Sequence, residues 1–319
     1  MTNKTSILIS NLRRLILASV ALLSLQVMAG GEVIKKSFDV NAGEELRVAT
    51  DVGSIEIETH SRSTVKVHVE IEGFDSDDFS VDMDYNSGVM KIDGKRNSRG
   101  WSRGGKRKVH FFVTIPERFN VDLSTRGGSI RVQDLEGEVQ ADTSGGSLKF
   151  GNIKGDINGR TSGGSISVGD VEGNVKVKTS GGSLRIGRID GNIRGRTSGG
   201  SISLDGVAGK ADVATSGGSI RIDSVGRSIS AKTSGGSIKA VFEKQPDGDS
   251  ELSTSGGSIT VTLPDDAALD IDARGSKVVS DFSIGGVKKA KRKLKGSING
   301  GGPELELHTS AGSVYIKRD

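Results

Sequence analysis

One six-residue motif recurs every 18 residues along the middle of the chain, and this period limits what the chain can fold into. Its first copy is Thr125-Arg126-Gly127-Gly128-Ser129-Ile130, and TSGGSI or TSGGSL begins again at residues 143, 161, 179, 197, 215 and 233. A further copy begins at residue 254 after a 21-residue step, and TSAGSV begins at residue 309. A fixed period is typical of repeat proteins in which each unit packs against its neighbours.

The apolar residues within each repeat follow the alternation of a β-strand. Leu184 and Ile186 alternate with polar residues, and Ile189 and Ile193 follow a bend. A period of two is that of a half-buried strand, and two glycines per repeat would penalise a helix. We therefore predict one coil per repeat, with coils stacked about 4.8 Å apart so that each strand pairs with its equivalents above and below.

The paired glycines of the motif are predicted to turn the chain at each corner, because glycine enters positive-φ conformations without steric cost. The Thr and Ser hydroxyls of stacked corners would form columns that bond to one another or to the backbone, or would present a regular polar surface to a repetitive ligand. The predicted turn glycines are Gly127, Gly128, Gly145, Gly146, Gly163, Gly164, Gly181, Gly182, Gly199, Gly200, Gly217, Gly218, Gly235, Gly236, Gly256 and Gly257.

The composition suits a thin core of small aliphatic side chains, because only 4% of the 319 residues are aromatic and 47 are glycine. We predict an all-β fold, a single-stranded β-solenoid similar to β-helices and β-rolls, with 18-residue coils, an irregular N-terminal β cap and a C-terminal closing coil. The predicted organisation is a signal peptide over residues 1–29, the cap over 30–124, the regular solenoid over 125–263, and C-terminal β coils with a cap over 264–319.

The first 29 residues have the pattern of a secretory signal peptide. Lys4, Arg13 and Arg14 precede the apolar run LILASVALLSLQV, and cleavage is expected after Ala29. A retained membrane anchor is disfavoured, because these 13 residues fall short of the roughly 20 that span a bilayer. Loss of the three basic residues lowers the formal net charge from +4 to +1. We expect the mature chain in the periplasm or outside the cell, without disulfides because cysteine is absent.

Three segments together resemble a known family. VTIPERFNVDLSTRGGSI, the repeated TSGGSI and the closing SINGGGPELELHTSAGSVYIK are similar to a bacterial β-strand repeat family of unknown function whose members carry the name "putative adhesin". The resemblance covers nearly the whole mature chain. It implies an exported β-solenoid with a surface or envelope role, and it brings no catalytic residues.

Two basic segments and one basic column are candidate polyanion-binding sites. The segment 95–108 is interpreted as a solvated hairpin loop or as a site for phosphate-rich polymer, anionic lipid headgroups or nucleic acid; its candidate residues are Arg96, Arg99, Trp101, Arg103, Lys106, Arg107 and Lys108. Its GxxxxGK spacing lacks the following Ser or Thr of a phosphate-binding loop, and a strand follows in place of a helix. The second segment, residues 288–295, is interpreted as a solvated edge.

The column is predicted from the outward position two residues after each corner serine. Five of the seven residues in this position are basic, namely Arg131, Lys149, Arg185, Arg221 and Lys239, while Ser167 and Ser203 occupy the other two. Stacked coils would place these cations one or two coils apart, which suits an extended polyanion, although a hydrated column of repelling charges is the alternative.

The residue patterns that would indicate a catalytic or metal site are weak in this sequence. The outward acids Glu136, Asp156 and Glu172 are taken to occupy differing positions, which argues against a shared catalytic face. The histidines, His60, His68, His110 and His308, lack metal-ligand spacing, and the corners lack the aspartate of calcium-binding rolls. No cofactor or metal is predicted.

We therefore predict a non-enzymatic envelope or surface protein, an adhesin-like or scaffolding module that presents a repetitive polar and basic surface. The sequence does not identify its partner; the candidates are an envelope or extracellular polyanion, such as a glycan, anionic lipid headgroups or DNA, and a protein. A polysaccharide-active β-helix enzyme is one alternative, and an envelope protein that assembles head to tail through its terminal coils is another.

Overall fold

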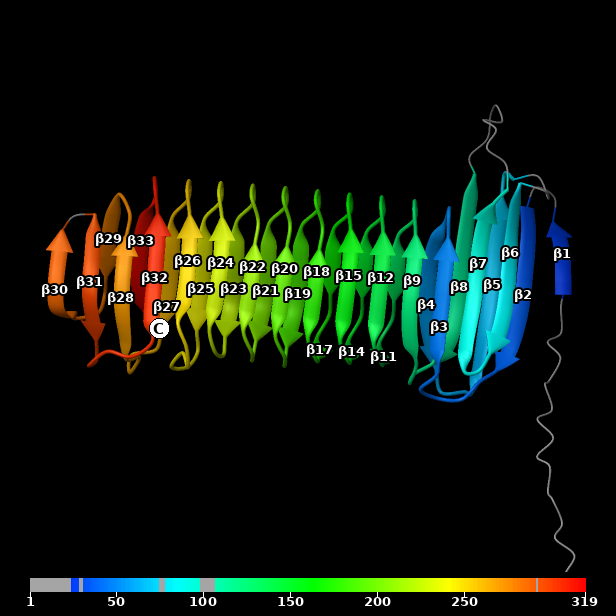
Figure 1. The fold of residues 1–319 in the computed structure, drawn as a ribbon, viewed down its shortest axis with the longest axis horizontal. Helices are drawn as coiled ribbons and strands as arrows, with labels where there is room; N and C mark the ends of the chain where they lie inside the picture. Colours follow the sequence, from blue (N-terminus) through cyan, green and yellow to red (C-terminus); the bar gives the residue numbers. More distant parts are fainter. Residues whose placement is uncertain (1–23, 29–30, 75–77, 98–106, 291) are drawn as a thin grey trace, which may run out of the picture.

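The computed structural model describes residues 24–28, 31–74, 78–97, 107–290 and 292–319. In these ranges the secondary structure is all β, and the strands form two sheets that face each other along one elongated stack (Figure 1). No helix long and apolar enough to cross a membrane occurs in this part of the chain. The predicted signal peptide, residues 1–29, lies largely outside the described residues.

Each repeat contributes one arm to each sheet. Sheet 1 contains the arms β4 (Ser54–His60), β10 (Ile130–Val132), β13 (Leu148–Phe150), β16 (Ile166–Val168), β19 (Leu184–Ile189), β21 (Ile202–Val207), β23 (Ile220–Val225), β25 (Ile238–Phe242) and β27 (Ile259–Leu263), and the short strands β11 (Leu135–Glu136), β14 (Ile153–Lys154) and β17 (Val171–Glu172). Sheet 2 contains β3 (Glu45–Thr50), β9 (Asn120–Thr125), β12 (Val139–Thr143), β15 (Ile157–Thr161), β18 (Val175–Lys178), β20 (Ile193–Arg196), β22 (Ala211–Ala214), β24 (Ile229–Thr233) and β26 (Ser250–Thr254).

Successive repeats pair in parallel with an offset of one repeat. In sheet 1, Ile166 lies opposite both Leu148 and Leu184, and in sheet 2, Val175 lies opposite both Ile157 and Ile193. These pairings confirm the predicted stacking of eighteen-residue units. Every residue at a given position of the repeat therefore belongs to a column that runs along the stack.

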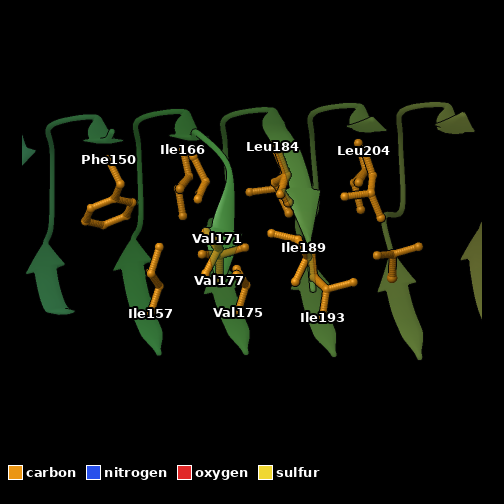
Figure 2. Packing of buried hydrophobic residues seen from close by; sticks show 14 of the residues in the cluster. Phe150, Ile157, Ile166, Val171, Val175, Val177, Leu184, Ile189, Ile193 and Leu204 are labelled. Carbon is orange, nitrogen blue, oxygen red and sulfur yellow. The ribbon is translucent and has the colours of Figure 1, made fainter. Parts of the chain in front are cut away.

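The core is a thin layer between the two sheets. Leu184, Ile186, Ile189 and Ile193 of one coil are all buried, and their equivalents in the neighbouring coils stack on them (Figure 2). Burial alternates along each arm because successive strand residues face opposite sides of a sheet. The inward positions predicted from the alternation are confirmed.

The corners are held by hydroxyl groups and by close backbone approach. Thr143 Oγ1 donates a hydrogen bond to the carbonyl oxygen of Gly128 in the preceding coil at 2.7 Å and accepts one from the Gly146 N–H at 3.3 Å. The N–H of Ser147 donates to Ser129 Oγ at 3.1 Å. The same set of bonds repeats at the later corners through Thr254.

The paired glycines were expected to supply positive φ angles at the corners, and this prediction is wrong. None of the corner glycines has a positive φ, and positive φ is found instead at Gly137, Gly155 and Gly173 of the opposite bend. The second corner glycine is required because an added Cβ on Gly146 would overlap the backbone of Gly128 one coil below. The corner therefore selects glycine for close stacking and not for a left-handed turn.

The N-terminal end adds antiparallel strands to the stack. In sheet 1, β2 (Gly31–Asp39), β5 (Thr64–Glu72) and β8 (Lys108–Pro116) pair antiparallel, with β1 (Ser24–Met28) on the far side of β2. In sheet 2, β6 (Phe79–Asn86) and β7 (Val89–Arg96) form a hairpin. Parallel pairing of β8 with β4 and of β7 with β3 joins these strands to the first coil.

At the C-terminal end, the prediction that the last residues form a closing coil is wrong. The last strands in sequence, β32 (Glu304–Thr309) and β33 (Ser313–Arg318), stack directly on β26 and β27. The preceding strands β28 (Leu269–Arg274), β29 (Lys277–Ser280), β30 (Gly285–Ala290) and β31 (Lys293–Ile298) lie beyond them. The final coil is therefore internal, because residues 264–302 pass over it before the chain returns (Figure 1).

Candidate polyanion-binding surfaces

The basic column predicted on sheet 1 is in register. Arg131 pairs with Lys149, Lys149 with Ser167, and Ser167 with Arg185, and the register continues through Ser203 and Arg221 to Lys239. The five cations are exposed. Two of them already have acidic partners, since Arg131 lies 3.3 Å from Glu56 and Arg221 lies 2.8 Å from Asp223. Lys149, Arg185 and Lys239 are left without an ion pair among the described residues, two and three coils apart.

The predicted loop site is only partly described. Arg99, Trp101, Arg103 and Lys106 lie outside the described residues. Arg107 is half-buried, 3.5 Å from Asp78 and 5.0 Å from the centroid of the Phe74 ring. Arg96 ends β7 and Lys108 begins β8, and both are exposed.

The second basic segment contributes one described ion pair. Lys295 lies 3.5 Å from Asp272, which also binds the Arg274 guanidinium at 3.0 Å. The hydrogen bonds from Arg274 hold the pKa of the Asp272 carboxyl below its usual value, against the opposing effect of burial. These contacts fasten β31 to β28, so this part of the segment has a structural role.

A denser group of cations lies on the outer face of sheet 2, and the sequence reasoning did not find it. It consists of Arg160, Lys176, Lys178, Arg194 and Arg196, here called the sheet-2 basic patch. Arg160, Lys178 and Arg196 are consecutive members of one column, and Lys176 and Arg194 are consecutive in the neighbouring column. The signal lies in the second arm of each repeat, where alignment of the outward positions by coil brings these cations together.

One carboxylate serves two of these cations. Asp212 Oδ2 accepts a hydrogen bond from Arg194 Nε at 3.0 Å, and Asp212 Oδ1 accepts one from Arg196 NH2 at 2.6 Å. Burial raises the pKa of Asp212, but the hydrogen bonds and charges of Arg196 and Arg194 outweigh it and lower the pKa below the usual value. Asp212 is therefore ionised at neutral pH. Among the described residues, Arg160, Lys176 and Lys178 have no ion pair.

A groove of about 1040 Å³ runs along the same face from β9 to β22, and Lys176 and Arg194 line it. Its other wall is a ladder in which each Asn or Asp side chain caps the next coil: Asp156 Oδ1 accepts from the Asn174 N–H at 2.8 Å, and Asn174 Oδ1 accepts from the Asn192 N–H at 3.0 Å. One end of the groove is acidic, with Glu45, Asp122, Glu138 and Asp156, and the other end is mainly basic, with Lys176, Arg194, Lys210 and Arg227 beside Asp212.

A second groove, of about 710 Å³, lies over the bend of sheet 1 and is rich in acids. Glu136 and Glu172 line it and belong to one column, with Lys154 between them, so the expectation that these acids occupy differing positions is wrong for this pair. The two residues are two repeats apart in the sequence. Lys154 lies 3.4 Å from Glu172, and Arg118 lies 3.3 Å from Glu136, so both carboxylates already have basic partners.

Two of the four histidines, which the sequence separates, come together on the N-terminal strands. The His110 ring centroid lies 4.0 Å from that of Phe112, and the His68 centroid lies 5.7 Å from it. His110 Nε2 lies 3.7 Å from Glu56, and His68 Nε2 lies 3.4 Å from Glu70. Among the described residues, no three His, Asp or Glu side chains form a group that could hold a metal ion.

These features define an all-β protein of stacked coils whose outer faces carry columns of polar and charged side chains. Residues 44–317 match the family model Toastrack DUF4097, and the chain belongs to this family. No curated protein matches the chain.

Solved structures give distant likenesses. One is a "putative adhesin" from Bacteroides fragilis NCTC 9343, with 14% identity, a TM-score of 0.35, and coverage of 90% of this chain and 97% of that one. Another is a "putative lipid binding protein" from Parabacteroides distasonis ATCC 8503, with 16% identity, a TM-score of 0.42, and coverage of 72% and 96%. The family assignment depends on the family model alone.

Proposed function

We propose that the protein is an exported, non-enzymatic module of the bacterial envelope or cell surface, wound as a single-stranded β-solenoid. It acts in an adhesin-like or scaffolding manner by presenting its outer faces to an extended partner. The observation that carries this proposal is the parallel register of the repeats, which converts one outward side chain per repeat into a column along the stack. A repetitive surface of this kind fits a repetitive ligand.

Export is supported by the sequence of residues 1–29. The non-enzymatic role is supported by the way the acids are used. Asp134 Oδ1 accepts from the Asn152 N–H at 2.8 Å, and Asp170 Oδ1 accepts from the Arg188 N–H at 2.8 Å. These carboxylates of the sheet 1 groove cap coils in the stack, so their structural role is enough to account for their presence.

A polysaccharide-active enzyme is the second candidate, because the sheet 1 groove gathers Glu117, Glu136, Glu172 and Asp190 with the two capping aspartates. Paired carboxylates are the groups that cleave glycosidic bonds. The enzyme would release new reducing ends from an envelope polysaccharide, whereas a binding module would leave the polymer at its original length.

The first experiment expresses the full chain in a bacterium and locates it by cell fractionation and N-terminal sequencing. We expect cleavage after Ala29 and recovery outside the cytoplasm. An uncleaved chain that stays in the cytoplasm would contradict the proposal.

The second experiment screens the purified protein for binding to envelope glycans, anionic vesicles and DNA at two salt concentrations, and assays the same glycans for new reducing ends. Binding without cleavage supports the module, and cleavage supports the enzyme. A variant with the basic residues of segment 95–108 changed to Gln tests the loop site: unchanged binding would remove that site from consideration.

A further inference from the structure

The sheet-2 basic patch concentrates charge in a way that the rest of the stack does not. Five cations lie on three consecutive coils, in two adjacent columns. Backbones of neighbouring coils are about 4.8 Å apart, and alternate residues of one strand are about 7 Å apart. These separations are shorter than the Debye length of about 8 Å at physiological ionic strength, so the charges repel one another.

Among the described residues, the fold offsets only part of this repulsion: Asp142 precedes Arg160 in its column without an ion pair, and Asp212 follows Arg194. Asp212 neutralises Arg194 and Arg196 in part, while Arg160, Lys176 and Lys178 have no ion pair in the described part of the chain. The three side chains are exposed and hold no neighbouring strand in place. By contrast, the sheet 1 column interrupts its cations with Ser167 and Ser203. An anion bound to the patch would relieve the repulsion.

The groove beside the patch favours a chain over a flat surface. It extends along the stack axis over six strands from β9 to β22, with the amides of Asn158, Asn174 and Asn192 along its length. A linear polymer can lie in such a groove and reach both the amides and the cations, whereas a bilayer contacts only the most protruding side chains. The acids Glu138 and Asp156 would repel a polyanion and confine it to the basic end.

The chemistry of the patch indicates phosphate. Three of its five cations are arginines, whose planar guanidinium matches the oxygens of a phosphate, and lysine is a common phosphate ligand. The outward neighbours of the patch in sheet 2, including Gln140, Asn158 and Asp212, are not aromatic. Without aromatic platforms, stacking on bases would not contribute to binding.

We infer that the sheet-2 basic patch and the basic end of its groove bind a linear phosphate-bearing polymer, laid along the stack and held by its phosphates. The inference deepens the proposed function by assigning the face and the chemistry of the partner. The same phosphate chemistry is present in polyol-phosphate polymers of envelopes and in single-stranded nucleic acid. Binding of a phosphate polymer that has no bases would show that the protein recognises the phosphate chain and not the bases.

The test measures the Kd of the purified protein for inorganic polyphosphate across a range of salt concentrations. The patch variant is Arg160→Gln, Lys176→Gln, Lys178→Gln. The matched control removes one arginine and two lysines that are exposed and lie outside every candidate site: Arg62→Gln, Lys277→Gln, Lys317→Gln. We expect the patch variant to bind about tenfold or more weakly, with the slope of log K against log salt reduced by about 2, because each lost phosphate contact removes a released counterion. The control should stay within about twofold, since it touches no ligand.

A gain of affinity gives a second readout that unfolding cannot imitate. In the variant Glu138→Gln, Asp156→Asn, the amide of residue 156 keeps an acceptor for the Asn174 N–H while the repelling charges are removed. We expect tighter binding, by about threefold, because the polymer can extend along the groove. Circular dichroism and thermal unfolding verify that each variant is folded.

Several results would overturn the inference: no binding of polyphosphate, equal losses in both triple variants, equal affinity for a polycarboxylate of the same length, or binding of single-stranded DNA alone. Binding of anionic vesicles without polyphosphate would replace the polymer with a membrane. If the protein is exported and binds another envelope partner, these results contradict the patch assignment but not the proposed function. If the protein stays in the cytoplasm, the proposed function is contradicted and the patch assignment is unaffected.

Discussion

The two glycines of a corner differ in what lies beside them, although the sequence repeats them as a pair. An added Cβ on Gly146 would overlap the Gly128 carbonyl of the coil below. An added Cβ on Gly145 would have the Gly127 carbonyl oxygen as its nearest neighbour, at 3.7 Å, which is ordinary van der Waals contact. The close backbone approach at this corner therefore requires glycine at the second position.

The first prediction compares Gly146→Ala with Gly145→Ala. Gly146→Ala should lower the free energy of unfolding by about 3 kcal/mol, because the new methyl group meets rigid backbone on a neighbouring coil. Gly145→Ala should change it by less than about 1 kcal/mol, since that position is exposed and open. Urea unfolding followed by circular dichroism measures both. Equal effects of the two substitutions would show that the corner does not discriminate between them.

At the scale of the strands, the sequence predicted the inward residues correctly because two periods agreed. Alternation along an arm gave the buried face, and the eighteen-residue offset gave the partner, as for Ile166 between Leu148 and Leu184. The equivalent corner of the first coil, at residues 51–54, receives the hydrogen bond from Thr125 Oγ1 to the Gly53 carbonyl at 2.8 Å.

Other features of the strands could not be predicted in this way. The return of β32 and β33 to the inside of the stack depends on how residues 264–302 pair, and β28 and β31 do so antiparallel without the repeat. The sheet-2 basic patch depends on irregular residues: Lys176 and Arg194 stand where Gln140 and Asn158 stand in the coils before them. The residues of such a column do not repeat as a sequence motif. The column becomes visible only when the outward residues of successive coils are aligned with one another.

One hydrogen bond ties the edge strand β6 to the turn before β3. Tyr85 donates from its hydroxyl to Glu44 Oε2 at 2.7 Å. Burial, together with this bond and the charge of Glu44, raises the pKa of Tyr85 to about 12. Burial acts to raise the pKa of Glu44, but hydrogen bonds from Asn41 and Tyr85 outweigh it and lower the pKa.

The second prediction concerns alkaline pH. Because the folded pKa of Tyr85 is raised above the unfolded value of 10, its contribution to stability is fully present below pH 10 and is lost as the pH rises through about 12. Ultraviolet titration should therefore show one tyrosine that ionises late, and Glu44→Gln should move its midpoint back toward 10. Tyr85→Phe supplies the control that identifies the signal. A midpoint unaffected by Glu44→Gln would show that burial alone sets it.

At the scale of the whole molecule, the stack behaves as a one-dimensional array. Each coil contacts chiefly the coil above and the coil below, and one coil cannot bury its apolar face without them. The corner bonds from Thr215 Oγ1 to the Gly200 carbonyl and from Thr233 Oγ1 to the Gly218 carbonyl have the same length, 2.7 Å. Neighbouring coils are therefore interchangeable at their corners.

The third prediction removes one coil. Deletion of residues 215–232 joins Ala214 to Thr233, so that one TSGGSI corner takes the place of another and every later residue keeps its face. This chain should fold, with the far-ultraviolet spectrum of the parent and a modest loss of stability from one missing coil interface. Deletion of residues 215–231 removes one residue fewer and shifts the register by one. The inward residues of the arm that follows would then face outward, because side chains alternate with a period of two. We expect this second chain to lose the cooperative unfolding transition or to aggregate. If both deletions unfolded with the same midpoint, register between coils would not determine the stability of the stack, since the two chains differ by a single residue.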